Sequence, residues 1–132
     1  GGTISGVGKY LKEQNPAVKV VAVEPANSAV LSGKAAGAHG LQGIGAGFVP
    51  DTLDTTIYDA VMPIYEQDAY ETGRMLATRV GLLVGITAGA AVYAAIQLAK
   101  DPENAGKTIV TLLPDGGEKY LTTPMFEESN EN

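Results

Sequence analysis

The chain has 132 residues, enough for one domain with a modest core. It contains no cysteine and one histidine, so it cannot form a disulfide, a thiolate metal site or a multi-histidine metal site by itself, and we predict no metal. The formal net charge of −6 argues against a nucleic-acid-binding surface, which is usually basic. A chain without cysteine fits a reducing compartment, and we expect a cytoplasmic protein.

The first half of the chain predicts two strands separated by a long glycine-rich loop. Valine-rich and β-branched runs indicate the strands, and six glycines mark the loop. In chain order the predicted elements are a helix over 5–14, a strand over 18–25, a short helix over 28–32, a loop over 33–50 and a strand over 56–64.

The second half continues the alternation of helices and strands. The predicted elements are a helix over 66–80, a strand over 82–86, an alanine-rich helix that ends at Lys100, a turn over 101–107, a strand over 108–113, a loop over 114–120 and a frayed polar tail over 127–132. The alternation favours an α/β fold with a mainly parallel sheet and helices on both faces.

The uncharged run over residues 81–99 is nearly long enough to cross a bilayer. Gly85, Thr87 and Gly89 interrupt it, and weakly hydrophobic alanine dominates the rest. We therefore expect a short strand, a turn and a buried helix, and no membrane association.

Three loops are candidates for a binding site. Ligands of parallel α/β sheets lie beyond the carboxyl ends of the strands, and the segments 85–89 and 114–118 fall there. The opening Gly1, Gly2 and Thr3 precede a helix, where backbone N–H groups and the helix dipole favour an anion. The alternative is that these glycines only allow the chain to turn.

Other candidate residues also have structural interpretations. Thr87 is either an N-cap or a hydroxyl presented to a ligand at a strand end. His39 fits a loop histidine that hydrogen-bonds the backbone, and Asp115 fits a turn residue. From the residues alone we expect an α/β ligand-binding unit, with a phosphate-bearing molecule as one candidate ligand.

Five blocks, in order, resemble the cysteine synthase (O-acetylserine sulfhydrylase) family of fold-type II pyridoxal-phosphate enzymes. The resemblance covers the whole chain, and "QGIGAGF" favours this family over cystathionine β-synthase. The blocks are "GGTISGVGKYLKE", "VEPANSAVLSG", "HGLQGIGAGFVP", "GLLVGITAGAAVYAA" and "LLPDGGEKYLTTPMFE". This resemblance implies that residues 1–132 are the C-terminal part of the large pyridoxal-phosphate-binding domain.

The resemblance also implies roles for individual residues. Gly1, Gly2 and Thr3 match the end of the family's phosphate-binding loop, and Thr87 matches the hydroxyl that hydrogen-bonds the pyridine nitrogen. Two further pairs are implied: Gln42 and Gly43 at the substrate entrance, and Pro114 and Asp115 beside the cofactor ring.

The implied activity is synthesis of L-cysteine from O-acetyl-L-serine and sulfide by β-elimination and addition. The family's Schiff-base lysine and substrate-carboxylate loop precede the matched region, so we expect no catalytic residue in this chain and no activity from it alone. Implied partners are the N-terminal portion of the enzyme and a second copy in a homodimer, and serine acetyltransferase is allowed. The alternatives are a cystathionine β-synthase-type β-replacement enzyme and a non-catalytic structural fragment.

Overall fold

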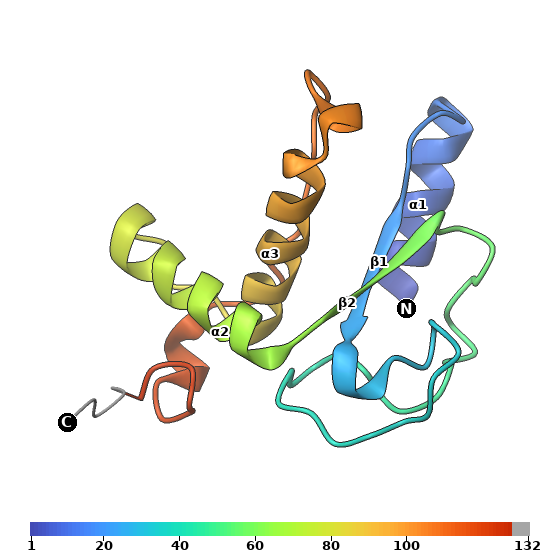
Figure 1. Cartoon of the computed structure of the whole chain (residues 1–132). Coiled ribbons are helices and arrows are strands. Elements are labelled where there is room, and N and C mark those ends of the chain that lie inside the picture. The colour runs from blue at the N-terminus through green and yellow to red at the C-terminus, as the bar shows by residue number, and fades with distance from the viewer. Residues whose placement is uncertain (128–132) are drawn as a thin grey trace.

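The computed structural model describes residues 1–127; the polar tail predicted over 127–132 lies almost wholly outside them. Two parallel strands, β1 (Val21–Pro25) and β2 (Ala60–Ile64), pair in register from Val21 opposite Ala60 to Pro25 opposite Ile64. Helix α1 (Gly2–Gln14) lies on one side of this pair and α3 (Ile86–Lys100) on the other (Figure 1). The α/β class with a parallel sheet and helices is confirmed.

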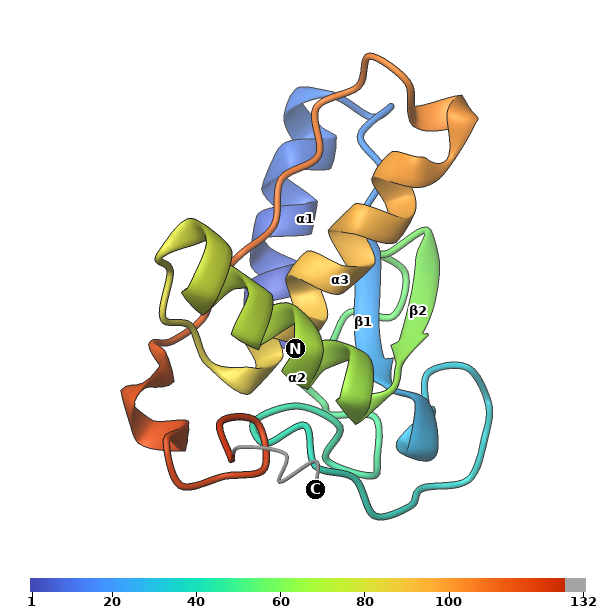
Figure 2. The ribbon, with the colours of Figure 1, turned by 60° about the vertical axis from the view of Figure 1, so that its left-hand side comes forward.

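The two central helices, α2 (Glu66–Met75) and α3, pack tightly against each other (Figure 2). A Cβ built on Gly89 of α3 would collide with the carbonyl oxygen of Ala69 in α2, so only glycine allows this approach. The main buried cluster forms between these helices and the end of β2. Its members are Leu41, Ile64, Ala69, Ile86, Ala90, Ala94 and Met125.

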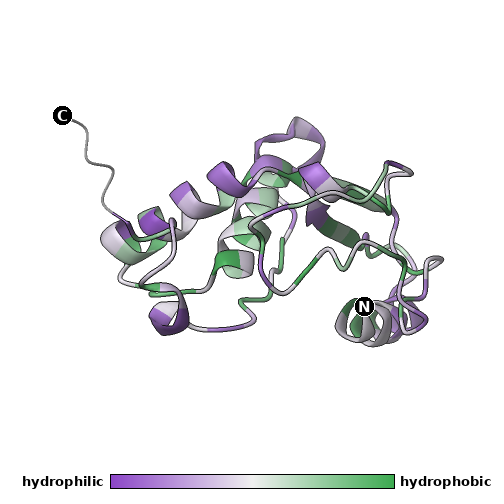
Figure 3. Ribbon diagram, turned by 90° about the horizontal axis from the view of Figure 1, so that it is seen from below, coloured by the Kyte–Doolittle hydropathy of each residue, from purple (hydrophilic) through white to green (hydrophobic). Residues whose placement is uncertain are grey.

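The predicted helix over 66–80 has a change of form within it. After Met75 the chain continues as a π-helical turn over Leu76–Val80, which ends at Gly81 in the left-handed region (φ 76°). In Figure 3 the ribbon of α2 carries many hydrophilic residues, whereas α3 is mostly pale or green apart from its polar C-terminal end. The apolar composition of α3 fits its position, because α3 contacts both α2 and the two strands.

Residues 81–99 do not form one helix, because α3 begins at Ile86. Among residues 1–127, no helix has the length and apolar character needed to cross a membrane. The strand predicted over 82–86 is reduced to an isolated antiparallel bridge between Val84 and Gly116.

The strand predicted over 108–113 is wrong for this chain: the segment is extended but unpaired. The side chains of Val110 and Leu112 are 88% and 62% exposed. A strand needs a neighbour to hydrogen-bond its backbone, and the sheet within residues 1–127 has only β1 and β2. The short helix predicted over 28–32 is instead a 3₁₀ turn over Ala26–Ser28 followed by irregular turns.

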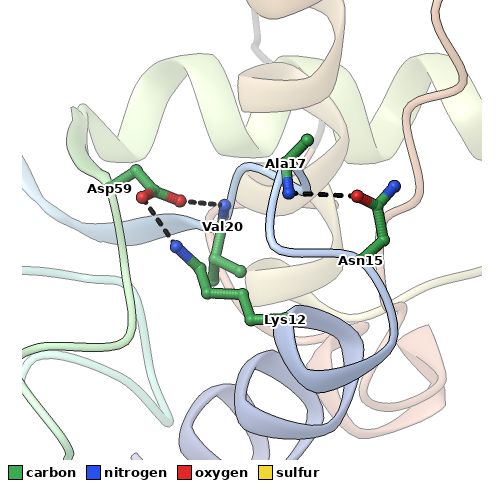
Figure 4. Close-up of polar contacts among 5 residues, drawn as sticks. All are labelled: Lys12, Asn15, Ala17, Val20 and Asp59. Atoms are coloured by element: carbon green, nitrogen blue, oxygen red, sulfur yellow. Dashed lines mark hydrogen bonds and ion pairs between the residues drawn. The ribbon is translucent and has the colours of Figure 1, made fainter.

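Asp59 ties α1 to the two strands (Figure 4). Its Oδ1 accepts from Lys12 Nζ of α1 at 2.7 Å, and its Oδ2 accepts from the Val20 N–H, just before β1, at 2.7 Å. The Lys12 hydrogen bond first, and the Val20 N–H second, lower the pKa of Asp59. Beside it, Asn15 Oδ1 accepts from the Ala17 N–H and closes the turn after α1.

Candidate functional site

One end of the fold gathers the features that the sequence predicts for ligand binding. The carboxyl ends of β1 and β2 point to this end, and α1 and α3 both begin there (Figures 1 and 2). Ligands of parallel α/β folds occupy this position because strand ends open into loops and helix N-termini direct N–H groups outward.

The α1 N-terminus is formed by the three opening residues themselves. The helix begins at Gly2 with Gly1 as N-cap, so Gly2 and Thr3 belong to its first turn, and the expected start near Ser5 is too late. No side chain caps the helix, no acidic residue lies in its first turn, and Gly1, Gly2 and Thr3 are exposed. The exposed N–H groups and the positive dipole end can accept an anion.

Ser5 holds this first turn in place, a role that the sequence reasoning missed. Its Oγ donates to Gly1 O at 2.7 Å and accepts from the Asp54 N–H at 2.8 Å. A Cβ on Gly1 would lie 2.6 Å from Leu53 Cβ, so the loop before β2 packs directly on the helix start. A serine at the fourth helical position is too common to signal this contact from sequence.

The interpretation of Thr87 as an N-cap is wrong. Gly85 is the N-cap of α3, Thr87 is the second helical residue, and no side chain among residues 1–127 caps this helix. Thr87 is half-buried, and a Cβ on Gly43 would lie 3.9 Å from its Cγ2 methyl. The entrance-loop candidate Gly43 therefore lies against Thr87.

Asp115 reaches the start of α3 from the other side. The Gly85 N–H donates to Asp115 O at 3.1 Å, and the Tyr120 hydroxyl donates to Asp115 Oδ2 at 2.5 Å. Asp115 Oδ1 is buried without a hydrogen-bond partner among residues 1–127, and a Cβ on Gly85 would collide with it. Asp115 is thus more than a turn residue, because its Oδ1 is an unused hydrogen-bond acceptor beside the N-terminus of α3.

Hydrogen bonding to Asp115 raises the pKa of the Tyr120 hydroxyl, and burial adds to the shift. The phenol therefore stays protonated and keeps donating to the carboxylate. The sequence shows Tyr120 only five residues after Asp115, a spacing that does not predict the contact.

The predicted residues divide into two groups. Gly43, Thr87 and Asp115 surround the start of α3, and Pro114 and Gln42 are their exposed neighbours. Gly1, Gly2 and Thr3 lie at the same end of the fold but pack on the loop before β2.

A surface cavity of about 590 Å³ lies elsewhere, along α2. Its lining includes Glu66, Tyr70, Arg74 and Phe126 and none of the predicted site residues. Within residues 1–127, no three acidic or histidine side chains cluster closely enough to hold a metal ion. The strand-end geometry, rather than this open cavity, remains the candidate site.

His39 behaves as predicted, as a loop histidine bonded to backbone. Its Nε2 is 2.8 Å from Gly45 O, and its Nδ1 accepts from the Leu41 N–H at 3.1 Å. Both partners lie within the glycine-rich loop, so the imidazole closes that loop on itself.

Known proteins match the chain along most of its length. The family model described as pyridoxal-phosphate dependent enzyme matches residues 1–115. A cysteine synthase of Staphylococcus aureus is 53% identical over 126 residues, which cover 96% of this chain and 40% of that protein.

Two solved structures from Entamoeba histolytica are similar. The cysteine synthase has a TM-score of 0.94 at 45% identity and is matched over 98% of this chain and 38% of its own. O-acetyl serine sulfhydrylase isoform 3 has a TM-score of 0.94 at 49% identity, over 98% of this chain and 39% of its own. The chain thus spans about 40% of the length of these relatives. With its α/β fold and these matches, the chain belongs to the family of pyridoxal-phosphate-dependent enzymes.

Proposed function

We propose that this chain is the C-terminal part of the large cofactor-binding domain of a cysteine synthase, and that the whole enzyme makes L-cysteine from O-acetyl-L-serine and sulfide. The observation that carries the proposal is the 53% identity to a cysteine synthase over 96% of the chain. The arrangement at the carboxyl ends of the strands supports the proposal. The uncapped N-terminus of α1 and the N-terminus of α3, which carries the Thr87 hydroxyl, lie at the same end of the fold.

The residues present fit pyridoxal phosphate. The N–H groups of the α1 first turn, at Gly2 and Thr3, suit the phosphate, since no acidic side chain there opposes an anion. The Thr87 hydroxyl suits the pyridine nitrogen, and Pro114 and Asp115 would border the ring. The orphan Oδ1 of Asp115 is an observation in favour of a ligand here, because a buried carboxylate oxygen is rarely left without a donor.

Pyridoxal phosphate, when bound, supplies the electron sink for loss of acetate and addition of sulfide at the β-carbon. The Thr87 hydroxyl would offer the ring nitrogen an uncharged partner, a choice that suits a mild electron sink for β-elimination. Gln42 and Gly43 border the substrate's path beside Thr87. The proton transfers and the covalent link would fall to a lysine in the N-terminal portion of the enzyme, so we expect this chain alone to be inactive.

Exposed apolar surface supports a larger fold around this chain. Val110 and Leu112 on the unpaired extended segment are exposed, and so are Val7 and Tyr10 on α1. Such residues are usually buried in a sheet or against its helices. We propose that the N-terminal portion of the enzyme covers them, that the enzyme is a cytoplasmic homodimer, and that serine acetyltransferase is a compatible partner.

The test uses the full-length protein and its Thr87→Val variant. Valine keeps the shape but removes the hydroxyl, which should weaken cofactor binding by about 0.5–1.5 kcal/mol and slow acetate release more than it lowers cofactor content. Thr78→Val is the matched control, because it removes an exposed hydroxyl of the π-helical turn that donates to Arg74 O, at the end of α2.

Cofactor absorbance and acetate release from O-acetyl-L-serine are the measurements. A full-length protein that binds no pyridoxal phosphate would support a non-catalytic structural role instead. A protein that uses homocysteine in preference to sulfide would support the cystathionine β-synthase alternative. Unchanged rates in Thr87→Val would remove Thr87 from the site.

A further inference from the structure

The glycine-rich loop that carries Gln42 and Gly43 is anchored by α2 at one residue, Gly40. The Glu66 carboxylate accepts from the Gly40 N–H through Oε2 at 2.5 Å, and the Tyr70 hydroxyl donates to Gly40 O at 3.1 Å. Glu66 and Tyr70 are four residues apart on one face of α2, so a single helical turn satisfies both polar groups of one peptide residue.

The contact leaves no room for a side chain at position 40. A Cβ built on Gly40 would collide with Tyr70 Oη and lie 2.5 Å from Glu66 Oε2. The next residue, Leu41, is fully buried in the main core cluster. Hydrogen bonds between two α2 side chains and the Gly40 backbone, together with the buried Leu41 side chain, therefore hold this end of the loop in place.

The imidazole of His39 fixes the loop a second time. Because Nδ1 accepts from the Leu41 N–H, the proton of the neutral ring lies on Nε2, which donates to Gly45 O. The two hydrogen-bond partners assign this tautomer. Through them the imidazole links two positions of the same loop, Leu41 and Gly45.

Between these anchors the backbone forms a short exposed arch. Gln42 and Gly43 are exposed, and Gly43 (φ 107°) and Gly45 (φ 66°) adopt conformations that favour glycine. Gly43 faces the Thr87 methyl at the start of α3. The position of the arch relative to Thr87 is thus set by residues that do not themselves border the candidate site.

We propose that Glu66, Tyr70 and His39 are positioning residues that hold the 40–45 arch against the start of α3. The consequence for catalysis rests on the proposed function: the arch would form one wall of the path taken by the amino-acid substrate. Loosening it should raise the KM for that substrate and leave kcat nearly unchanged, because no group that reacts is moved.

The test compares variants of the full-length protein. Tyr70→Phe removes one hydroxyl, and Glu66→Ala removes the acceptor for the Gly40 N–H. The matched controls are Tyr65→Phe and Glu71→Ala, exposed residues that flank the same helical turn. Glu66→Gln retains a side-chain acceptor and should rescue much of the Glu66→Ala effect.

Amide hydrogen exchange of the peptide covering residues 40–45 is the first measurement. We expect exchange about fivefold to tenfold faster in Tyr70→Phe and Glu66→Ala, corresponding to the loss of one hydrogen bond, and parental exchange in both controls. Parental exchange in Tyr70→Phe and Glu66→Ala would overturn the proposal, and so would equal acceleration in the controls.

The steady-state constants are the second measurement. A KM for O-acetyl-L-serine raised about fivefold, with kcat within about twofold, supports the positioning role. An unchanged KM despite faster exchange would overturn that role. If the parent protein makes no cysteine, the proposed function fails, and the exchange comparison still decides whether these side chains hold the arch.

Discussion

Tyr120 donates its hydroxyl hydrogen to one carboxylate oxygen of Asp115, while the other oxygen is buried without a partner among residues 1–127. The same aspartate accepts the Gly85 N–H through its carbonyl oxygen. Tyr120 therefore orients an acceptor at the start of α3, next to the helical turn that carries Thr87. The contact can be tested through the ionisation of the phenol.

We expect Tyr120→Phe to change the stability profile at high pH. The folded-state pKa of Tyr120 is raised above the unfolded value of about 10, so the contact stabilises the fold fully below that pH. Its contribution is lost as the pH rises through the folded pKa. Urea unfolding from about pH 9 to about pH 11 should therefore show a steeper decline in the parent than in the variant.

Asp115→Asn provides the second arm of this experiment. An asparagine still accepts from the phenol but carries no charge, so the decline should be intermediate. Parallel pH profiles for the parent and Tyr120→Phe would contradict the contact.

Asp59→Asn should destabilise the fold more than Lys12→Met. The first substitution disturbs the contacts with both Lys12 and the Val20 N–H, and the second removes only the ion pair. Because the pKa of Asp59 is lowered, the stabilisation is present above the unfolded pKa near 4 and is lost as the pH falls through the folded value. Denaturant unfolding at about pH 3 to about pH 7 measures this, and equal losses in both variants would show that the Val20 contact contributes nothing.

Two glycines between α2 and α3 should respond differently to alanine. A Cβ on Gly89 meets the Ala69 carbonyl, which is backbone and cannot move without shifting a helix, whereas a Cβ on Gly73 meets the flexible end of Met125. We expect Gly89→Ala to cost about 1–3 kcal/mol, and Gly73→Ala to cost less than about 1 kcal/mol because alanine also favours helix. The midpoints of urea unfolding give the order, and a reversed order would contradict the helix contact.

Val110→Ser should destabilise the full-length protein although Val110 is 88% exposed in this chain. If a neighbouring strand covers the segment, the loss should be about 1–3 kcal/mol. Val49→Ser, at an exposed valine of the glycine-rich loop, should stay within about 0.5 kcal/mol of the parent. A neutral Val110→Ser would show that the segment stays uncovered in the full-length protein.

Local patterns predicted α1, α2 and α3 in outline and both paired strands, but not the short helix over 28–32. The helix over 5–14 and the alanine-rich helix ending at Lys100 appear as α1 and α3, and the strands over 18–25 and 56–64 appear in shorter form. The strand predicted over 108–113 does not form in this chain. Its β-branched pattern indicates a tendency to form a buried strand, but no neighbouring strand within residues 1–127 pairs with it. A helix forms its backbone hydrogen bonds between residues four positions apart in the same segment, whereas a strand needs a neighbouring strand to form its own.

The sequence by itself determined the α/β class, the family and the backbone-bonded role of His39, because these depend on short ordered patterns. Only the tertiary structure decided that Thr87 does not cap α3 and that Asp115 leaves a buried acceptor beside it. It also decided that Gly40 is held from α2 by Glu66, 26 residues away. These contacts join residues from different elements, so their partners are set by how helices and loops pack rather than by spacing along the chain.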